Sequence, residues 1–266
     1  MAFLIINADD FGKDSETNRA VSIAKEEGIL TSASLMVIGE RWEEAAEISK
    51  EKNLDIGLHA SITEGKSILL RKKINISPFW IGLKAQFCSS SLMWIKKEIE
   101  LQCKRFASIG LPFSHINSHH HIHIHHKISR LFLKACLDYK IKAIRIPHEI
   151  WSISRPVLTL KNICYRIIFS LLTASLTNQV NRTQLFFPNA VFGLYMTSRI
   201  TEEWIEGLLE RLASVKGIYE LYFHPVDKKG SPGFRELQIL TNSRIREKIH
   251  KLGIKLISFS EASIHA

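Results

Sequence analysis

The sequence predicts an α/β protein whose strands form a parallel sheet, either open or closed into a barrel. Short apolar runs of the kind found in buried strands alternate along the chain with longer segments of helical periodicity. With 45% apolar and 23% charged residues, the 266-residue chain has the composition of a globular protein. No internal repeat or linker divides it, so we expect one domain that spans residues 1–266.

The first half of the chain contains four expected strands, each a short apolar run. They cover residues 2–7, 30–37, 54–58 and 115–117. Helices are expected from Ser15 to a stop at Gly28 and over residues 41–52, 92–109 and 127–137. Residues 64–90 contain Pro78 and serine-rich turns. We expect this long stretch to be irregular and to form a lid or a binding loop.

The second half is expected to contain strands at 143–146, 217–223 and 255–258 and helices at 204–212 and 245–251. The segment 158–176 is rich in apolar residues but also contains Lys161 and Arg166. We expect an amphipathic helix there, which either covers the core or lies on a membrane surface.

The charge and the cysteines narrow the class of protein. A formal net charge of +10 admits an anionic partner, such as a membrane surface. No basic motif interleaved with aromatic residues indicates nucleic acid, so we expect no nucleic-acid partner. The four cysteines are widely spaced, which favours reduced thiols in a cytoplasmic protein. The chain has neither a secretory signal pattern nor an uncharged apolar stretch of about 18 residues, so peripheral membrane contact is the most that we expect.

Polar residues follow four of the expected strands at the points where these strands end. Asp9 and Asp10 follow the first strand, His59 follows the third, and His224 follows the strand at 217–223. The histidine run 119–123 follows the short strand at 115–117. In parallel α/β folds, ligands bind outside the carboxyl ends of the strands. We therefore expect these four clusters to converge.

Histidine is concentrated in one segment, because residues 114–126 contain seven of the twelve histidines. This density favours metal binding over a solvated polar turn. On a helix, His119 and His123 would share a face, whereas on a strand His121 would join them. The spacing alone leaves both arrangements open.

Asp9 and Asp10 are adjacent, so their side chains must diverge. One of them could bind a metal while the other acts on a metal-bound water. The alternative is that one of them caps the following helix, although Asp14 and Ser15 are better placed for that role.

Two charged residues lie within apolar strand patterns. Arg145 interrupts the run at 143–146 and requires a buried partner or an anionic ligand. Glu220 likewise lies in an apolar strand pattern and also requires a partner for its charge. The chain lacks the glycine-rich motifs of nucleotide-binding proteins and the nucleophile elbow of serine hydrolases.

Five motifs together resemble the YdjC-like carbohydrate deacetylases, a family that includes chitooligosaccharide deacetylases and the hopanoid-biosynthesis-associated (HpnK) deacetylase. In chain order they are Asn7-Ala-Asp-Asp-Phe-Gly12, Gly28-Ile-Leu-Thr-Ser-Ala33, Gly57-Leu-His59, the run from His115 to His123, and Glu220-Leu-Tyr-Phe-His-Pro225. The similarity extends from Leu4 to Pro225. The segments 144–147, 188–194 and 208–212 resemble the HpnK branch more closely than the chitooligosaccharide branch.

The resemblance implies a distorted (β/α) barrel, TIM-like in its parallel strands, with one divalent metal ion, Mg²⁺ or Zn²⁺. By position, the implied metal ligands are Asp10, His59 and His119. Asp9 matches the general base and His224 resembles the general acid. His123, Arg145 and Glu220 are expected to support the site or to contact substrate. Asn117 stands where the motif frequently has aspartate, and Val226 stands where relatives usually have glycine.

The implied activity is hydrolysis of the N-acetyl group of an amino sugar, in an oligosaccharide or a glycolipid, with release of acetate. One alternative is a metal-dependent phosphoesterase on a related barrel, which would need several convergent arginines or lysines. Another is a non-catalytic sugar-binding relative, which would need a broken pair of Asp9 and His224. A homodimer is compatible with each of these functions.

Overall fold

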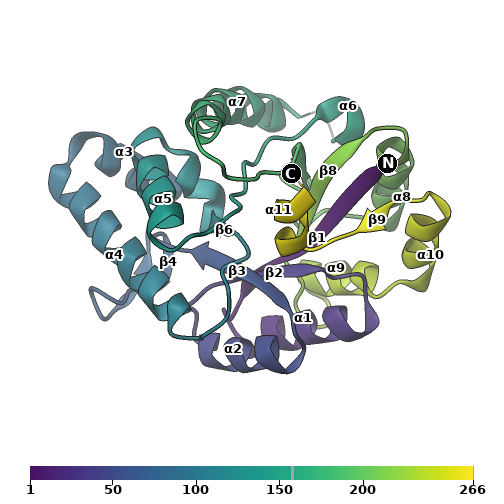
Figure 1. Ribbon diagram of the computed structural model, residues 1–266, viewed down its shortest axis with the longest axis horizontal. Coiled ribbons are helices and arrows are strands. Elements are labelled where there is room, and N and C mark those ends of the chain that lie inside the picture. Colours follow the sequence, from purple (N-terminus) through teal and green to yellow (C-terminus); the bar gives the residue numbers. More distant parts are fainter. Residues whose placement is uncertain (157–158, 266) are drawn as a thin grey trace.

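A parallel β-sheet lies at the centre of the computed structural model, which describes residues 1–156 and 159–265, and helices pack around this sheet (Figure 1). Each of its seven strands runs parallel to its neighbours. In spatial order they are β6 (Ile116–Ser118), β3 (Asp55–Ala60), β2 (Ser32–Leu35), β1 (Ala2–Phe11), β8 (Gly217–Phe223) and β7 (Ala190–Phe192), with β9 (Lys255–Leu256) paired to the start of β1. The predicted α/β class is confirmed.

Residues 142–148 connect the two edges of the sheet. The N–H of Ile116 in β6 donates to the carbonyl of Ala143 at 3.0 Å, and the carbonyl of Ile116 accepts from the N–H of Arg145 at 3.1 Å. On the other side, the N–H of Val191 in β7 donates to the carbonyl of residue 148 at 2.8 Å. These contacts close the sheet into the distorted barrel that the family resemblance implied.

The expected strand at 143–146 is wrong in detail, because this segment makes only isolated bridges, from Ile144 to Ile116 and from Ala143 to Phe186. Successive residues pair with different neighbours, and Pro147 has no N–H with which to extend either ladder.

The expected helices all form. They are α1 (Ser15–Glu27), α2 (Trp42–Glu51), α4 (Ser89–Ala107), α5 (His126–Asp138), α7 (Leu160–Val180), α8 (Glu202–Ala213) and α10 (Ser243–Lys251). Asp14 caps α1, because its Oδ1 accepts from the N–H of Thr17 at 2.8 Å, and neither Asp9 nor Asp10 has this role. Position 158, where the seventh helix was expected to begin, lies outside the described residues. No sequence pattern indicated α6 (Trp151–Ser154), α9 (Pro232–Leu240), α11 (Phe259–His265) or strand β7.

Residues 64–90 are not irregular, contrary to expectation. They form an antiparallel hairpin of β4 (Glu64–Lys66) and β5 (Lys73–Asn75), followed by α3 (Pro78–Phe87). The loop of the hairpin is held by the buried carboxylate of Glu98 in α4, which accepts from Ser67 Oγ at 2.8 Å and from the N–H groups of Ile68 and Leu69, each at 3.0 Å. A partner some thirty residues away supplies this order, so the local pattern does not show it.

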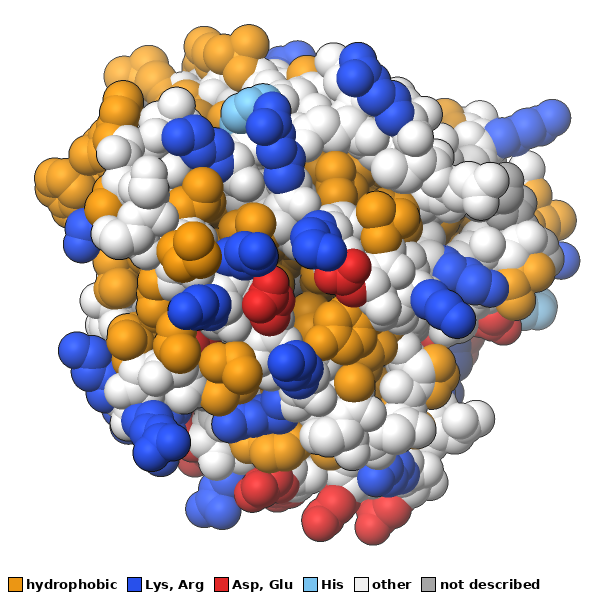
Figure 2. Space-filling view, turned by 60° about the vertical axis from the view of Figure 1, so that its left-hand side comes forward, with side chains coloured by type: hydrophobic (Ala, Val, Ile, Leu, Met, Phe, Trp, Pro, Cys, Tyr) orange, Lys and Arg blue, Asp and Glu red, His pale blue; other side chains and the backbone are white. Residues whose placement is uncertain are grey.

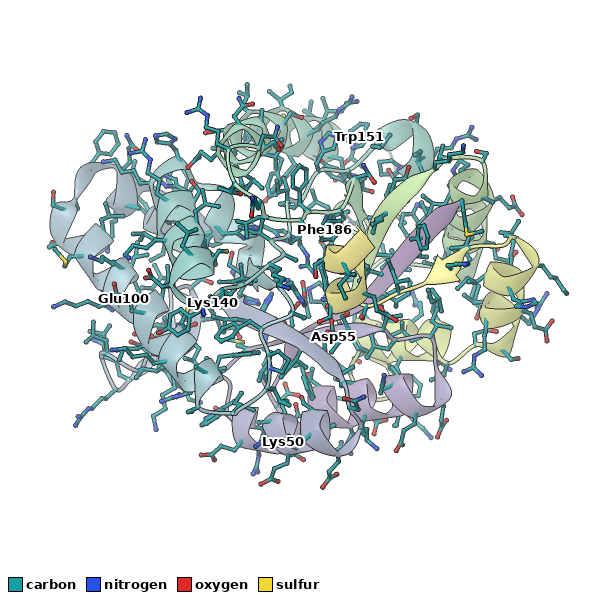
Figure 3. All side chains as sticks on the ribbon, in the orientation of Figure 1. Lys50, Asp55, Glu100, Lys140, Trp151 and Phe186 are labelled. Carbon is teal, nitrogen blue, oxygen red and sulfur yellow. The ribbon has the colours of Figure 1, made fainter. Side chains whose placement is uncertain are left out.

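The end of the barrel opposite the carboxyl ends of the strands is covered by α11. Phe259 packs there with Ile5 and Ile257, and Phe186 lies against this cluster. Figure 3 labels Phe186 beside this last helix. Because apolar side chains fill this end, polar groups gather at the other end, where the strands finish.

Candidate active site

Three side chains from three different strand ends meet at the carboxyl edge of the sheet. Asp10 lies near the end of β1, His59 near the end of β3, and His119 directly after β6. Asp10 Oδ1 is 2.9 Å from His119 Nδ1 and 3.2 Å from His59 Nε2. One oxygen or nitrogen from each of the three residues lies within 4.8 Å of the others. Three of the four expected polar clusters, those of Asp10, His59 and His119, therefore converge in the structure.

These donors fit a divalent metal ion. One carboxylate and two imidazoles are a common ligand set for such ions. Asp10 Oδ1 is buried and, within the described part of the chain, accepts no hydrogen bond of good geometry. Burial by itself would raise the pKa of Asp10, but the charges of His119 and His59 outweigh it and hold that pKa well below its usual range. Asp10 is thus an ionised carboxylate with a free lone pair.

The backbone around this cluster is strained. Asp10 has a φ of 62°, and His120 and His121 have φ values of 54° and 53°. Left-handed conformations cost side-chain-bearing residues about 1–3 kcal/mol each and concentrate at functional sites. The histidine run is a kinked 3₁₀ turn, η1 (His119–Ile124), and is neither the helix nor the strand that the spacing left open.

Hydrogen bonds orient each of the two imidazoles. His59 Nδ1 lies 2.7 Å from Asn117 Oδ1 and can donate to it, which leaves Nε2 facing Asp10. His119 Nε2 lies 3.2 Å from Glu64 Oε2, which leaves Nδ1 facing Asp10. Partners of this kind fix the ring orientation of metal-binding histidines. Sequence reasoning missed Glu64 in this role, because the residue lies in the stretch that was expected to be irregular.

Lys13 is the second polar partner of Glu64. Its Nζ is 3.0 Å from Glu64 Oε1 and 3.6 Å from Asp10 Oδ2. The hydrogen bond to His119 and the ion pair with Lys13 lower the pKa of Glu64 to about 2, although partial burial opposes them. Burial lowers the pKa of His119, but Asp10 and Glu64 raise it more, to about 9. A metal that binds His119 must therefore displace a proton.

Asp9 is bound by Arg145, and its Oδ1 also lies 3.8 Å from His59 Nδ1. The guanidinium is fully buried and donates from Nη1 to Asp9 Oδ2 at 2.6 Å and from Nη2 to Asp9 Oδ1 at 3.0 Å. Its Nε also donates to both carboxylate oxygens of Glu220, at 2.9 and 3.0 Å. The sequence-based requirement that Arg145 needs a buried partner or an anionic ligand is met by two carboxylates.

This network sets the charges of both acids. Burial raises the pKa of Asp9, but the charge of Arg145 outweighs it and holds that pKa far below its usual range. For Glu220, burial and the nearby Asp9 exceed the attraction of Arg145, so the pKa rises to about 7. Asn7 and Asn117 also donate to Asp9 Oδ1, at 2.9 and 3.3 Å. Asp9 is therefore fixed in position and fully ionised.

The remaining predicted residues are His224 and His123. His224 follows β8, is partly exposed, and donates its backbone N–H to Glu236 Oε2 at 2.5 Å. His123 is buried, with Nδ1 at 2.6 Å from Ser118 Oγ and Nε2 at 2.9 Å from the carbonyl of Arg145. His123 thus ties the histidine turn to the segment that carries Arg145, while His119 faces Asp10.

A groove of 1130 Å³ opens beside the cluster and shares Lys13 and Glu64 with it. The β4–β5 hairpin forms one wall, with Arg71 and Lys73, and Trp42 of α2 lies on another side. This groove is large enough for a carbohydrate of several rings, since its volume is slightly above the usual range of about 300–1000 Å³ for ligand clefts.

A parallel barrel with a carboxylate, two imidazoles and a second ionised acid at its strand ends has the groups that hydrolases use for acid–base chemistry. The model of the family described as YdjC-like protein matches residues 3–251, and the chain belongs to this family. It is 29% identical to a carbohydrate deacetylase of Brevibacillus brevis over 97% of this chain and 98% of that protein. It is also 29% identical to a chitooligosaccharide deacetylase of Serratia marcescens, with the same coverage of both chains.

A solved structure has the same fold. It is that of a proposed cellobiose-phosphate cleavage protein from Enterococcus faecalis V583, with a TM-score of 0.73, 22% sequence identity and 97% coverage of both chains. The two proteins therefore share their fold over nearly the full length of both chains.

Proposed function

We propose that this chain is a divalent-metal-dependent carbohydrate deacetylase that hydrolyses the N-acetyl group of an amino sugar. The observation that carries the proposal is the meeting of Asp10, His59 and His119 beside a groove whose lining includes Glu64, the partner of His119. The full-length similarity to proteins named carbohydrate deacetylases supports the choice of substrate class.

Asp10, His59 and His119 would hold the metal ion. When bound, the ion polarises the acetyl carbonyl and lowers the pKa of a water molecule. Two imidazoles and one carboxylate favour Zn²⁺ by ligand type, whereas the family resemblance also admits Mg²⁺.

Asp9 and His224 carry the proton transfers in this proposal. Asp9, oriented by Arg145, accepts a proton as the water oxygen bonds to the acetyl carbon. His224 donates a proton to the sugar nitrogen as the carbon–nitrogen bond breaks, so that a neutral amine and acetic acid leave, and the acid loses its proton to solvent to become acetate. Without that proton the amine would be a very poor leaving group.

The groove favours a substrate with an anionic group near the sugar. Lys13, Lys66, Arg71 and Lys73 line it, against the acids Asp14, Glu40 and Glu64. We propose an N-acetylated glycolipid or oligosaccharide, with the glycolipid favoured by the likeness of 144–147 and 188–194 to the HpnK branch.

The two alternative functions lose their supporting features. Arg145, the cation that the sequence offered for a phosphoesterase, is fully buried and engaged by Asp9 and Glu220. A non-catalytic relative needs a broken acid–base pair, but Asp9 and His224 are both present.

The test is acetate release from N-acetylglucosamine, diacetylchitobiose and an N-acetylglucosaminyl lipid. Metal-stripped protein is assayed alone and after addition of Zn²⁺, Mg²⁺ or Co²⁺, beside an Asp9→Asn control. We expect release from at least one substrate that depends on added metal. Bound metal with no release from any of the three substrates would overturn the proposal.

A further inference from the structure

Charge is divided unevenly along this chain. Residues 65–201 contain 20 Lys and Arg but only four Asp and Glu, whereas the rest of the chain contains 16 and 22. Residues 151–200 contain five basic residues and no acidic residue at all. The basic segment forms α3 to α7, which make up the left and upper parts of Figure 1, away from α1, α2, α9 and α10.

The amino-terminal half of α7 projects its apolar side chains into solvent. Leu160, Ile163, Ile167 and Leu171 are 78%, 42%, 59% and 71% exposed. Their spacing of three and four residues places them along one stripe of the helix. Only the other half of α7 packs against the barrel, as the burial of Leu176 shows. The expected role of this helix in covering the core thus holds for half of it.

Helix α3 presents a second apolar stripe, this one largely aromatic. Phe79, Trp80, Leu83 and Phe87 are 68%, 54%, 40% and 80% exposed, while Ile81 on the inner side is buried. Large aromatic side chains at this density on an exposed helix mark an interaction surface.

The two helices border the histidine turn. Lys127, near the start of α5, donates from Nζ to the carbonyl of Gln86 in α3 at 2.6 Å. On the opposite side, Gln179 of α7 donates to Ser129 Oγ of α5 at 3.1 Å. Both helices also contact η1, which carries His119. The two helices that carry the exposed stripes therefore lie beside the histidine turn of the candidate active site.

Basic side chains accompany the apolar ones. The upper part of the face in Figure 2 shows hydrophobic, lysine and arginine side chains and no acidic side chain. Arg166 of α7 lies 4.5 Å from the ring centre of Trp151, which Figure 3 labels at the top of the molecule. A shallow groove of 730 Å³ between them is lined mainly by Ile163, Ile167 and Leu171.

We propose that the exposed stripes of α3 and α7 together bind the surface of an anionic phospholipid bilayer. This α3/α7 surface is defined by Phe79, Trp80, Leu83, Phe87, Leu160, Ile163, Ile167 and Leu171. Apolar stripes enter the boundary between headgroups and acyl chains, and nearby cations attract acidic headgroups. Among the described residues no helix has the length and apolarity required to cross a bilayer, so both helices lie on it. If the proposed deacetylase function holds, docking brings a glycolipid headgroup to the site.

The first test is flotation of the wild-type chain with phosphatidylcholine vesicles, with and without phosphatidylglycerol. We expect binding only with phosphatidylglycerol. Binding should weaken as salt rises from about 0.1 M to about 1 M, because the Debye length falls from about 10 Å to about 3 Å. Leu171→Glu should lower the partition coefficient about tenfold or more. Leu137→Glu, at an equally exposed leucine (71%) in the last turn of α5, should leave it unchanged.

The second test reads the position of α7 directly. Cys164 is an exposed free thiol on α7, and replacing Cys88 by alanine leaves it as the only thiol of the chain that is not buried. A polarity-sensitive fluorophore on Cys164 should shift to the blue with anionic vesicles and return on addition of salt. No shift, despite flotation, would show that another surface binds lipid and would overturn the assignment.

Two further outcomes would also overturn the proposal. One is absence of flotation at low salt. The other is a concentration-dependent dimer in sedimentation equilibrium that Leu171→Glu abolishes, which would show that the α3/α7 surface is a dimer interface. Acetate release from soluble diacetylchitobiose is measured separately. Its failure refutes the proposed activity and leaves vesicle binding untouched, whereas loss of flotation alone refutes only the docking.

Discussion

Asp9 and Asp10 are neighbours in the chain, and both are buried, but the protein treats their carboxylates in opposite ways. Both oxygens of Asp9 accept hydrogen bonds, from Arg145, Asn7 and Asn117. Asp10 Oδ1 faces two imidazoles and accepts no well-formed hydrogen bond within the described chain. One carboxylate is fixed by the protein itself, and the other is left available for a ligand. The same substitution at the two positions should therefore have different consequences.

Asp10→Asn should have the largest effect. Losing the only anionic ligand should remove stoichiometric metal and, with it, detectable acetate release. Elemental analysis of the dialysed variant and the acetate assay provide the two readouts. Full metal occupancy in this variant would show that Asp10 is not a ligand.

Asp9→Asn should lower turnover about 10²–10⁴-fold, because a proton acceptor is lost while the metal ligands stay in place. Metal content should equal that of the wild type. If metal is lost here as in Asp10→Asn, the contrast between the two carboxylates fails and Asp9 is a ligand.

Arg145→Met should destabilise the fold by about 3–5 kcal/mol, since it leaves Asp9 and Glu220 buried without their cation. Urea unfolding followed by circular dichroism measures this loss. Adding Glu220→Met should restore part of it by removing one of the two stranded charges. Unchanged stability of the single variant would mean that the network contributes nothing to folding.

Asn117→Ala should weaken metal affinity about 10–100-fold, because His59 loses the hydrogen bond that orients its ring. Competition with a fluorescent chelator gives the affinity. Asn7→Ala is the matched control, since Asn7 also donates to Asp9 and Ser34 but does not contact His59. Equal losses in both variants would assign the effect to the Asp9 side of the site.

The smallest expected effect concerns pH. The folded-state pKa of Glu220 is raised to about 7, so its protonated form favours the fold. Its contribution to stability is complete below the unfolded pKa of about 4.3 and is lost as pH rises through 7. Glu220→Gln should therefore flatten the fall in unfolding free energy between pH 5 and 8 by about 1–3 kcal/mol. An unaltered pH profile would show that Glu220 is ionised throughout.

Sequence patterns predicted correctly those strands and helix ends that depend on residues close together in the chain. Apolar runs gave most of the strands, and Asp14 and Gly28 marked the ends of α1 correctly. The segment around Arg145 was misjudged, because its pairing depends on two distant neighbours. The hairpin at 64–75 was missed for the same reason, since Glu98 supplies its order from α4.

The sequence predicted which strand ends come together at the site, but not which histidine side chains face Asp10. Strand ends at one edge of a sheet must lie together, and this reasoning placed His59 and the histidine run beside Asp10. Which histidine turns toward Asp10 depends on the left-handed backbone of His120 and His121, which no spacing rule contains. Glu64 and Glu236 carried no motif, because each acts through contacts with distant residues that form only in the folded state.

The separation of charge between residues 65–201 and the rest of the chain also affects how the molecule approaches a charged surface. A molecule with one strongly cationic side and one weakly anionic side has a large electric dipole moment. In the field of an anionic surface such a dipole experiences a torque, so the molecule turns before it makes contact. Its encounters with that surface are therefore oriented rather than random, and the basic side arrives first.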